Sequence, residues 1–268
     1  MSGQGNTADM QQFHCMGAKI AYRHRSSGGA EAITILYLRS EESLPADASF
    51  EDALAAQGNV IIPDHPGFGA SDNPGWFRGM GDVAYAYLDL FAALGLRNVH
   101  IVGASIGGWI GAEIALRNTS RIASLSLIAP LGVRQPGCSF GDVFLWTPEQ
   151  NIRNRFTDQA LAEHFLQAEQ TSETTAALLK DRYATARIGW APRFHNPELQ
   201  RWLHRITPRT LLVWGANDRI APPQMAQAWQ AGLPDSRLVT IPDCGHLPHM
   251  EAADLTAAEV AAFIEEAR

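Results

Sequence analysis

The stretch Val99-His100-Ile101-Val102-Gly103-Ala104-Ser105-Ile106-Gly107-Gly108 points to the fold of this chain of 268 residues. Its first four residues are apolar enough for a buried strand, and residues 106–117 are expected to form the helix that follows. A serine on so sharp a turn holds an uncommon backbone conformation, which is tolerable where the residues two positions away are small, as Gly103 and Gly107 are. The pattern predicts that Ser105 projects from the sheet as a nucleophile. The alternative is an ordinary turn between a strand and a helix.

Short apolar strands alternate with helices on both sides of this turn. The other predicted strands cover residues 16–25, 33–38, 59–63, 124–128, 210–214 and 237–241, and the other predicted helices cover 50–57, 81–96, 223–231 and 254–266. The first two strands are expected to flank a turn at 26–29. Such alternation is typical of an α/β fold, in which helices cover both faces of a mostly parallel sheet.

Residues 131–205 break the alternation. They contain two helix-like stretches, 158–168 and 172–186, and no strong buried strand. We therefore expect an α/β core formed by residues 1–130 and 206–268, with 131–205 inserted as a helical cap over the carboxyl edge of the sheet.

Aromatic side chains are candidates for the wall of a substrate pocket. Trp146, Trp190 and Trp202 lie in the predicted cap, and Trp109 lies in the helix after Ser105. They could line a pocket that favours an apolar or aromatic acyl group. The alternative is that they simply pack the cap onto the core, as buried aromatic residues commonly do.

Two further strands lead to side chains that could activate a serine. The serine hydroxyl is a poor nucleophile at neutral pH and needs a base that is itself oriented by an acid. The strand 210–214 leads to Asp218, and the strand 237–241 leads to His246. Open α/β sheets bind ligands where their parallel strands end. We therefore predict a catalytic triad in which Ser105 is the nucleophile, His246 the base and Asp218 the acid.

A second histidine, His249, raises the alternative of a metal site with His246. No set of carboxylates or cysteines completes such a pair, so neither a metal nor another cofactor is expected. The three cysteines, Cys15, Cys138 and Cys244, have the spacing of neither a disulfide framework nor a zinc site.

Composition restricts the class of partner. The formal net charge of −7 argues against a general nucleic-acid binder. The polar first residues lack the layout of a signal peptide, and no apolar run approaches the roughly 20 residues that span a bilayer. With the sparse cysteines, this favours a cytoplasmic protein that acts on a small molecule and has no nucleic-acid or membrane partner. A homodimer is left open.

Four motifs in this order resemble the α/β-hydrolase superfamily. The resemblance is strongest to its cap-bearing branch, which includes meta-cleavage-product hydrolases, enol-lactonases, haloperoxidases and esterases. Besides the serine turn, the motifs are Asp64-His65-Pro66-Gly67-Phe68-Gly69-Ala70-Ser71, the acid loop 214–222, and Cys244-Gly245-His246 with Glu251. The resemblance covers nearly the whole chain and implies the α/β-hydrolase fold with its eight-stranded sheet. Its motifs are specific for the fold and much less so for the substrate.

One stretch departs from the family's pattern. After the strand 33–38 the family usually has His-Gly, and the next residue donates a backbone N–H to the oxyanion hole. Here the sequence is Arg39-Ser40-Glu41. The resemblance then implies the amides of Glu41 and Ile106 as donors, with Arg39 and Ser40 beside the pocket. Arg39 could offer its charge to an anionic substrate group or be solvated. Losing one oxyanion donor typically costs about 10²–10³ in turnover.

These residues favour a carboxylesterase-like serine hydrolase. It would cleave a carboxylic ester, thioester or lactone through an acyl-enzyme, with His246 accepting the Ser105 proton. One alternative keeps the scaffold and changes the chemistry, to hydrolysis of a carbon–carbon bond or formation of a peracid. A second alternative is a non-catalytic ligand-binding protein with an inert triad, which the loss of His-Gly motivates.

Overall fold

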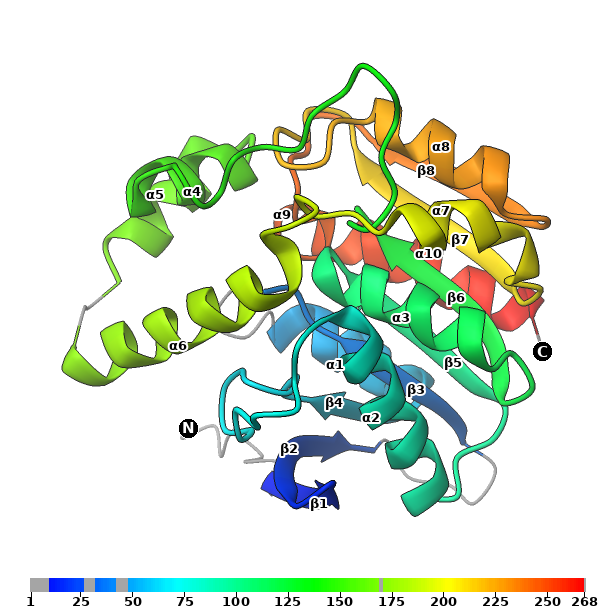
Figure 1. Ribbon diagram of the computed structural model, residues 1–268. Coiled ribbons are helices and arrows are strands. Elements are labelled where there is room, and N and C mark those ends of the chain that lie inside the picture. The colour runs from blue at the N-terminus through cyan, green and yellow to red at the C-terminus, as the bar shows by residue number, and fades with distance from the viewer. Residues whose placement is uncertain (1–9, 27–31, 42–47, 169–170, 268) are drawn as a thin grey trace, which may run out of the picture.

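The computed structural model describes residues 10–26, 32–41, 48–168 and 171–267. The strands in these ranges are β1 (Met10–Cys15), β2 (Ala18–Arg25), β3 (Ile33–Leu38), β4 (Gly58–Pro63), β5 (Val99–Ala104), β6 (Ile122–Ile128), β7 (Arg209–Gly215) and β8 (Ser236–Ile241). They form one eight-stranded sheet in the order β1-β2-β4-β3-β5-β6-β7-β8 (Figure 1). The pairs β1–β2 and β2–β4 are antiparallel and all others are parallel. The predicted mostly parallel sheet is confirmed.

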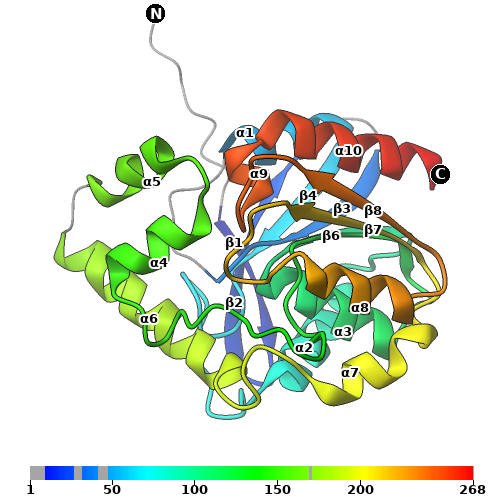
Figure 2. The same ribbon diagram turned by 90° about the horizontal axis from the view of Figure 1, so that it is seen from above.

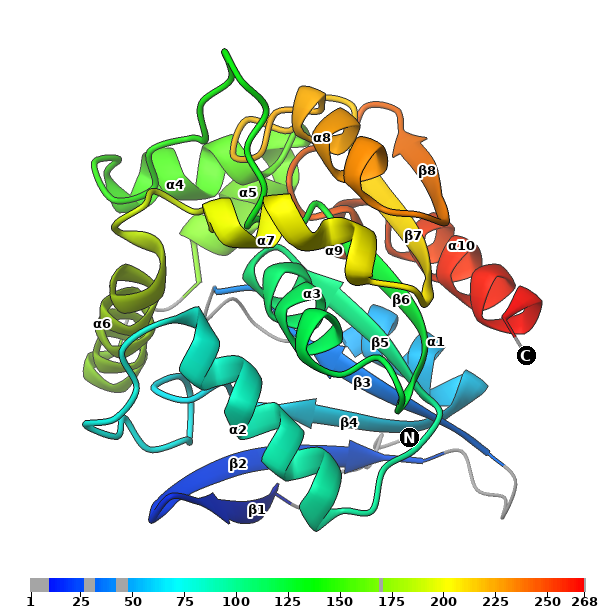
Figure 3. The same cartoon turned by 45° about the vertical axis from the view of Figure 1, so that its right-hand side comes forward.

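The beginning of the chain differs from the prediction. Met16 and Gly17 form a turn with φ of 49° and 79°, so the strand predicted over 16–25 begins at Ala18. β1 was not predicted, because only Phe13 and Cys15 of its six residues are buried. β4 lies between β2 and β3, so the strands on either side of the predicted turn do not pair with each other (Figure 3). That turn, at 26–29, falls mostly outside the described residues.

Helices cover both faces of the sheet (Figures 1 and 2). α2 (Met80–Ala93), α3 (Ile106–Arg117) and α8 (Gln224–Gly232) pack on one face. α1 (Ala48–Gln57) and α10 (Ala253–Glu266) pack on the other, and α9 (Pro248–Glu251) precedes α10. These helices agree with the predicted ones to within a few residues, except that α9 was not predicted.

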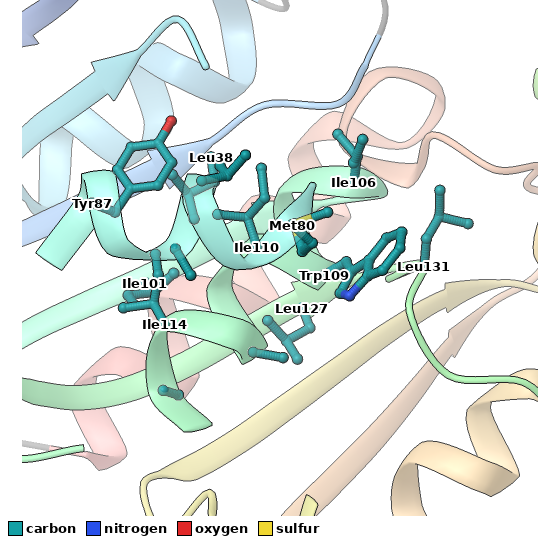
Figure 4. Packing of buried hydrophobic residues seen from close by; sticks show 14 of the residues in the cluster. Leu38, Met80, Tyr87, Ile101, Ile106, Trp109, Ile110, Ile114, Leu127 and Leu131 are labelled. Atoms are coloured by element: carbon teal, nitrogen blue, oxygen red, sulfur yellow. The ribbon is translucent and has the colours of Figure 1, made fainter. Parts of the chain in front are cut away.

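α3 packs into the apolar core where it crosses the sheet. Ile110 and Ile114 of this helix lie beside Leu38 and Ile101 of the strands, and Ile106 lies farther along, at the start of the helix (Figure 4). All five side chains are fully buried. Burial of an aliphatic side chain contributes about 1.5–3 kcal/mol, so this contact holds the helix that begins at Ser105 firmly against the sheet.

Residues 131–205 contain helices and no named strand in their described part. The helices are α4 (Pro148–Arg155), α5 (Gln159–Leu166), α6 (Ser172–Gly189) and α7 (Pro197–Trp202), followed by the short 3₁₀ helix Leu203–Arg205. α5 and α6 match the two predicted stretches, whereas α4 and α7 were not predicted. In Figures 1 and 2, α4, α5 and α6 stand beyond the end of the sheet, and α7 lies beside α3 and α8. The division into core and cap remains a prediction.

The register of the parallel strands brings their carboxyl ends to one edge. Leu38 pairs with Gly103, and Gly215 pairs with Ile241. The segments that leave β3, β5, β7 and β8 therefore emerge side by side. In the described part of the chain, no helix has the length and apolar character needed to cross a membrane.

Candidate active site

Ser105 sits on a strained turn between β5 and α3. Its backbone has φ of 52° and ψ of −113°, a conformation that costs a non-glycine residue on the order of 1–3 kcal/mol. A Cβ at Gly103 would lie 2.5 Å from the carbonyl oxygen of Gly107, and one at Gly107 would lie 2.0 Å from that of Leu38. The glycines are therefore needed because backbone meets backbone on both sides of the serine, as the motif predicted.

The three predicted triad residues converge at this edge of the sheet. Ser105 Oγ lies 2.8 Å from His246 Nε2, and His246 Nδ1 lies 2.8 Å from Asp218 Oδ2. The Asp218 carboxylate accepts from Nδ1–H, which leaves Nε2 as the acceptor for the serine hydroxyl. The other oxygen, Oδ1, accepts from the amides of Ile220 and Ala221 at 2.8 and 2.9 Å. The acid is thus held on both sides, and the arrangement suits nucleophilic catalysis.

The histidine loop is braced against two other segments. A Cβ at Gly215 would lie 1.9 Å from the carbonyl oxygen of Gly245, so the end of β7 touches this loop directly. Glu251 accepts from the amide of Gly245 and, with its other oxygen, from the amide of Asp158, both at 2.5 Å. Glu251 therefore ties the loop that carries His246 to the start of α5. The sequence motif included Glu251 but did not predict this role.

The Asp64–Ser71 loop is a second braced turn. Asp64 accepts from the amide of Ala70 at 2.8 Å, and the Ser71 hydroxyl donates to the Asp64 carbonyl at 2.7 Å. Asp181 of α6 accepts from the amide of Gly69 at 3.0 Å, and Lys180 donates to the Gly69 carbonyl at 2.6 Å. The loop thus anchors α6 to the end of β4.

A sequence profile of the alpha/beta hydrolase fold matches residues 42–253. The chain belongs to the α/β-hydrolase family. A 2-hydroxy-6-oxo-6-phenylhexa-2,4-dienoate hydrolase of Burkholderia cepacia is 31% identical over 230 residues, which are 75% of this chain and 75% of the relative. A 2-hydroxy-6-oxononadienedioate/2-hydroxy-6-oxononatrienedioate hydrolase of Comamonas testosteroni is 28% identical over 224 residues, 73% of each chain. A solved structure described as a membrane phospholipase A superposes with a TM-score of 0.80 at 23% identity, over 97% of this chain and 86% of its own, and shows the fold alone.

The hydrolase has a buried ion pair beside Ser105 that the sequence did not predict. Arg155 Nη1 lies 3.0 Å from Glu41 Oε1, and the two side chains are 0% and 2% exposed. Burial raises the pKa of Glu41, but Arg155, His246, the Glu41 backbone amide and the Ser105 hydroxyl outweigh it, so the pKa lies below its usual value. Glu41 is therefore an ionised carboxylate at the site.

This carboxylate lies at one of the two predicted oxyanion donors. Ile106 is the first residue of α3, where an amide has no acceptor within the helix, so it can donate to an oxyanion. The amide of Glu41 helps to lower the pKa of its own side chain, so this carboxylate would compete with an oxyanion for the same N–H. The donor function of Glu41 remains a prediction.

The predicted pocket residues fall in different environments. Trp109 is 2% exposed, donates to Glu113 at 3.0 Å and packs in the core beside Ile106 and Leu131 (Figure 4), which fits the packing alternative; a pocket role for it remains a prediction. Arg39 and Ser40 are half-buried directly after β3.

The tryptophans of residues 131–205 lie closer to the surface. Trp190 is 53% exposed and contacts Phe144 and Arg193, whereas Trp146 is half-buried against the core. A pocket role for Trp146 and Trp190 remains a prediction. His249, the other half of the metal alternative, packs edge-to-face on Phe50.

His65 fixes the segment that leads to Glu41. Its Nδ1 faces the Tyr87 hydroxyl at 2.5 Å, and its Nε2 lies 3.0 Å from the carbonyl oxygen of Arg39. Burial lowers the pKa of His65 to about 4. The ring is therefore neutral at physiological pH, with Nε2–H donating to Arg39 and Nδ1 accepting from Tyr87.

This histidine should make the protein less stable in acid. Below the ordinary histidine pKa of about 6.5 the unfolded chain binds a proton that folded His65 does not, so stability falls as pH drops from 6.5 towards 4. The loss should reach about 3 kcal/mol at pH 4. We expect His65→Gln to remove this part of the pH dependence in urea unfolding curves.

The exposed His24 provides the matched control, because His24→Gln should retain the wild-type pH dependence. An equal fall in stability between pH 6.5 and 4 for His65→Gln and wild type would contradict the assignment of a buried neutral ring.

Proposed function

We propose that this hydrolase cleaves a carbon–carbon bond beside a ketone in a dienoic acid. The sequence motifs favoured an ester, with carbon–carbon hydrolysis as the alternative. The observation that carries the alternative is the hydrogen-bonded set of Ser105, His246 and Asp218 in a chain whose relatives are named as hydrolases of 2-hydroxy-6-oxo-dienoates.

The chemistry of the relatives' substrates identifies the bond. The 2-hydroxy-6-oxo-6-phenylhexa-2,4-dienoate acted on by the Burkholderia cepacia relative contains a ketone at C6 and no ester or amide. Its hydrolysis must therefore break the bond between C5 and C6. The hydroxyl of water ends on C6, which becomes benzoic acid, and the electron pair of the broken bond stays on C5, which takes up a proton.

The triad can perform both halves of this reaction. His246 Nε2 accepts the Ser105 proton as Oγ bonds to C6, and the carbonyl oxygen becomes an oxyanion near the amide of Ile106. When the tetrahedral intermediate collapses, protonated His246 returns its proton to C5. Water then attacks the acyl-enzyme, with His246 again as base, and releases the acid. Asp218 stabilises the imidazolium in each step.

A comparison of two substrates tests the proposal. Purified protein is given 2-hydroxy-6-oxo-6-phenylhexa-2,4-dienoate or p-nitrophenyl acetate, and benzoate or p-nitrophenolate is quantified. We expect kcat/KM for the dienoate to exceed that for the ester by at least about tenfold, which corresponds to 1.4 kcal/mol of transition-state stabilisation. Turnover of the ester without formation of benzoate would refute the proposal and return the assignment to an esterase.

A further inference from the structure

The ion pair of Glu41 and Arg155 joins the two sides of the triad. Glu41 follows β3, three residues after Leu38, which pairs with Gly103 just before the nucleophile. Arg155 ends α4, and its carbonyl oxygen accepts from the amide of His246 at 2.7 Å. The two side chains, 114 positions apart in the chain, therefore meet beside both reacting residues.

The backbone of Arg155 lies directly against the loop that carries His246. A Cβ at Gly245 would lie 2.3 Å from the Arg155 carbonyl oxygen, so the backbone of residue 155 is pressed against the histidine loop. Its side chain is 0% exposed, so the packing around it restricts where the guanidinium can lie. Glu41 presents one oxygen to this guanidinium, and its other oxygen, Oε2, has no hydrogen-bond partner among the residues that the structure describes.

The position of the Glu41 carboxylate matters to a hydrolase for an electrostatic reason. Attack by Ser105 places a negative oxyanion near the amide of Ile106, and deacylation leaves a carboxylate there. Two like charges this close repel each other strongly in a site shielded from water.

We propose that Arg155, with the surroundings of Ser105 and His246, forms a carboxylate-binding site. Glu41 fills this site in the resting protein, and the carboxylic acid released from the acyl half of the substrate takes its place. Glu41 acts as an intramolecular mimic of the product. Its competition for Arg155 lowers the affinity of the site for the acid and so promotes product release. The inference rests on the proposed function only because the reaction must yield a carboxylic acid. Hydrolysis of the carbon–carbon bond beside a ketone yields one, and so does hydrolysis of an ester.

Binding of benzoate tests this site without any need for turnover. Calorimetry with sodium benzoate is carried out on wild type, Glu41→Ala, Glu41→Gln and the double variant Glu41→Ala with Arg155→Met. We expect Glu41→Ala to bind benzoate at least about tenfold more tightly than wild type, because a charge-assisted bond to Arg155 becomes available to the ligand. The double variant should lose this gain, and the neutral probe benzamide should show none.

Glu51 provides a matched control. It is a buried carboxylate that pairs with Arg23 and Arg25 on β2, away from the triad. Glu51→Gln should bind benzoate as wild type does, which separates the loss of a buried charge in general from the loss of Glu41.

Equal affinity of wild type and folded Glu41→Ala for benzoate would overturn the proposal and leave the pair as a purely structural one. Should Glu41→Ala fail to fold because it removes a buried partner of Arg155, Glu41→Gln decides, since it keeps the shape and removes the repelling charge. It should also bind benzoate more tightly than wild type. A protein that fails to cleave the dienoate but shows these affinities would refute the proposed reaction and not the binding site.

Discussion

Ser105→Ala should lower turnover by about 10⁴-fold or more, on whichever substrate the wild-type protein uses. The change removes the atom that bonds to the carbonyl carbon, while the binding site and the Ile106 amide remain, and such sites retain only a residual rate. The loss is expected in kcat rather than in KM, because Ser105→Ala leaves the substrate-binding site in place. Steady-state kinetics on the purified variant check this.

A buried serine of the neighbouring strand serves as the control. Ser126 lies on β6, is 1% exposed and has no part in the triad, so Ser126→Ala should keep turnover close to that of wild type. Both variants should fold, as circular dichroism would report. Wild-type turnover in folded Ser105→Ala would show that another group is the nucleophile, or that the protein does not use this triad at all.

Gly215→Ala should disrupt the fold and the site together. The added Cβ would lie 1.9 Å from the carbonyl oxygen of Gly245 and 2.5 Å from that of Cys244. Both are backbone atoms, so the strand and the histidine loop must move apart. We expect a loss of at least about 4 kcal/mol in the free energy of unfolding, which is exceptional for one methyl group and reflects this clash. Thermal and urea unfolding measure it.

The kinetic consequence of the same change is separable from the loss of stability. The loop that Gly215 touches carries His246, so any folded fraction should have a displaced base and a lower kcat. Gly79→Ala is the matched control. Its φ is −179° and a Cβ there meets nothing within 4 Å, so stability and turnover should change little. If Gly215→Ala is as stable and active as Gly79→Ala, then β7 and the histidine loop do not approach each other as closely as described.

The parallel core and the triad could be read from local patterns. A Gly-x-Ser-x-Gly between an apolar strand and a helix has one steric explanation, and the structure has the positive φ at Ser105 that this explanation requires. Asp218 and His246 were found because each follows an apolar strand, and parallel strands end at one edge of a sheet. These inferences needed only neighbours in sequence and a general property of α/β sheets.

Some elements were not predicted because their sequences have weak hydrophobic periodicity. β1 buries only two of its six residues, and α4 has the polar sequence Pro148-Glu149-Gln150-Asn151 in its first turn. α4 begins at a capping box formed by Thr147 and Gln150 and presents little apolar surface. Patterns of burial cannot locate an element that buries little.

Contacts between distant segments depended on the folded chain. Glu41 and Arg155 are separated by 114 positions, and Glu251 and Asp158 by 93, so neither pair has a spacing that a helix or a strand would impose. Local sterics and hydrophobic periodicity act over a few residues and could therefore be read directly from the chain. The charge beside Ser105 and the brace behind His246 arise from segments that are far apart in the chain and meet only in the folded structure.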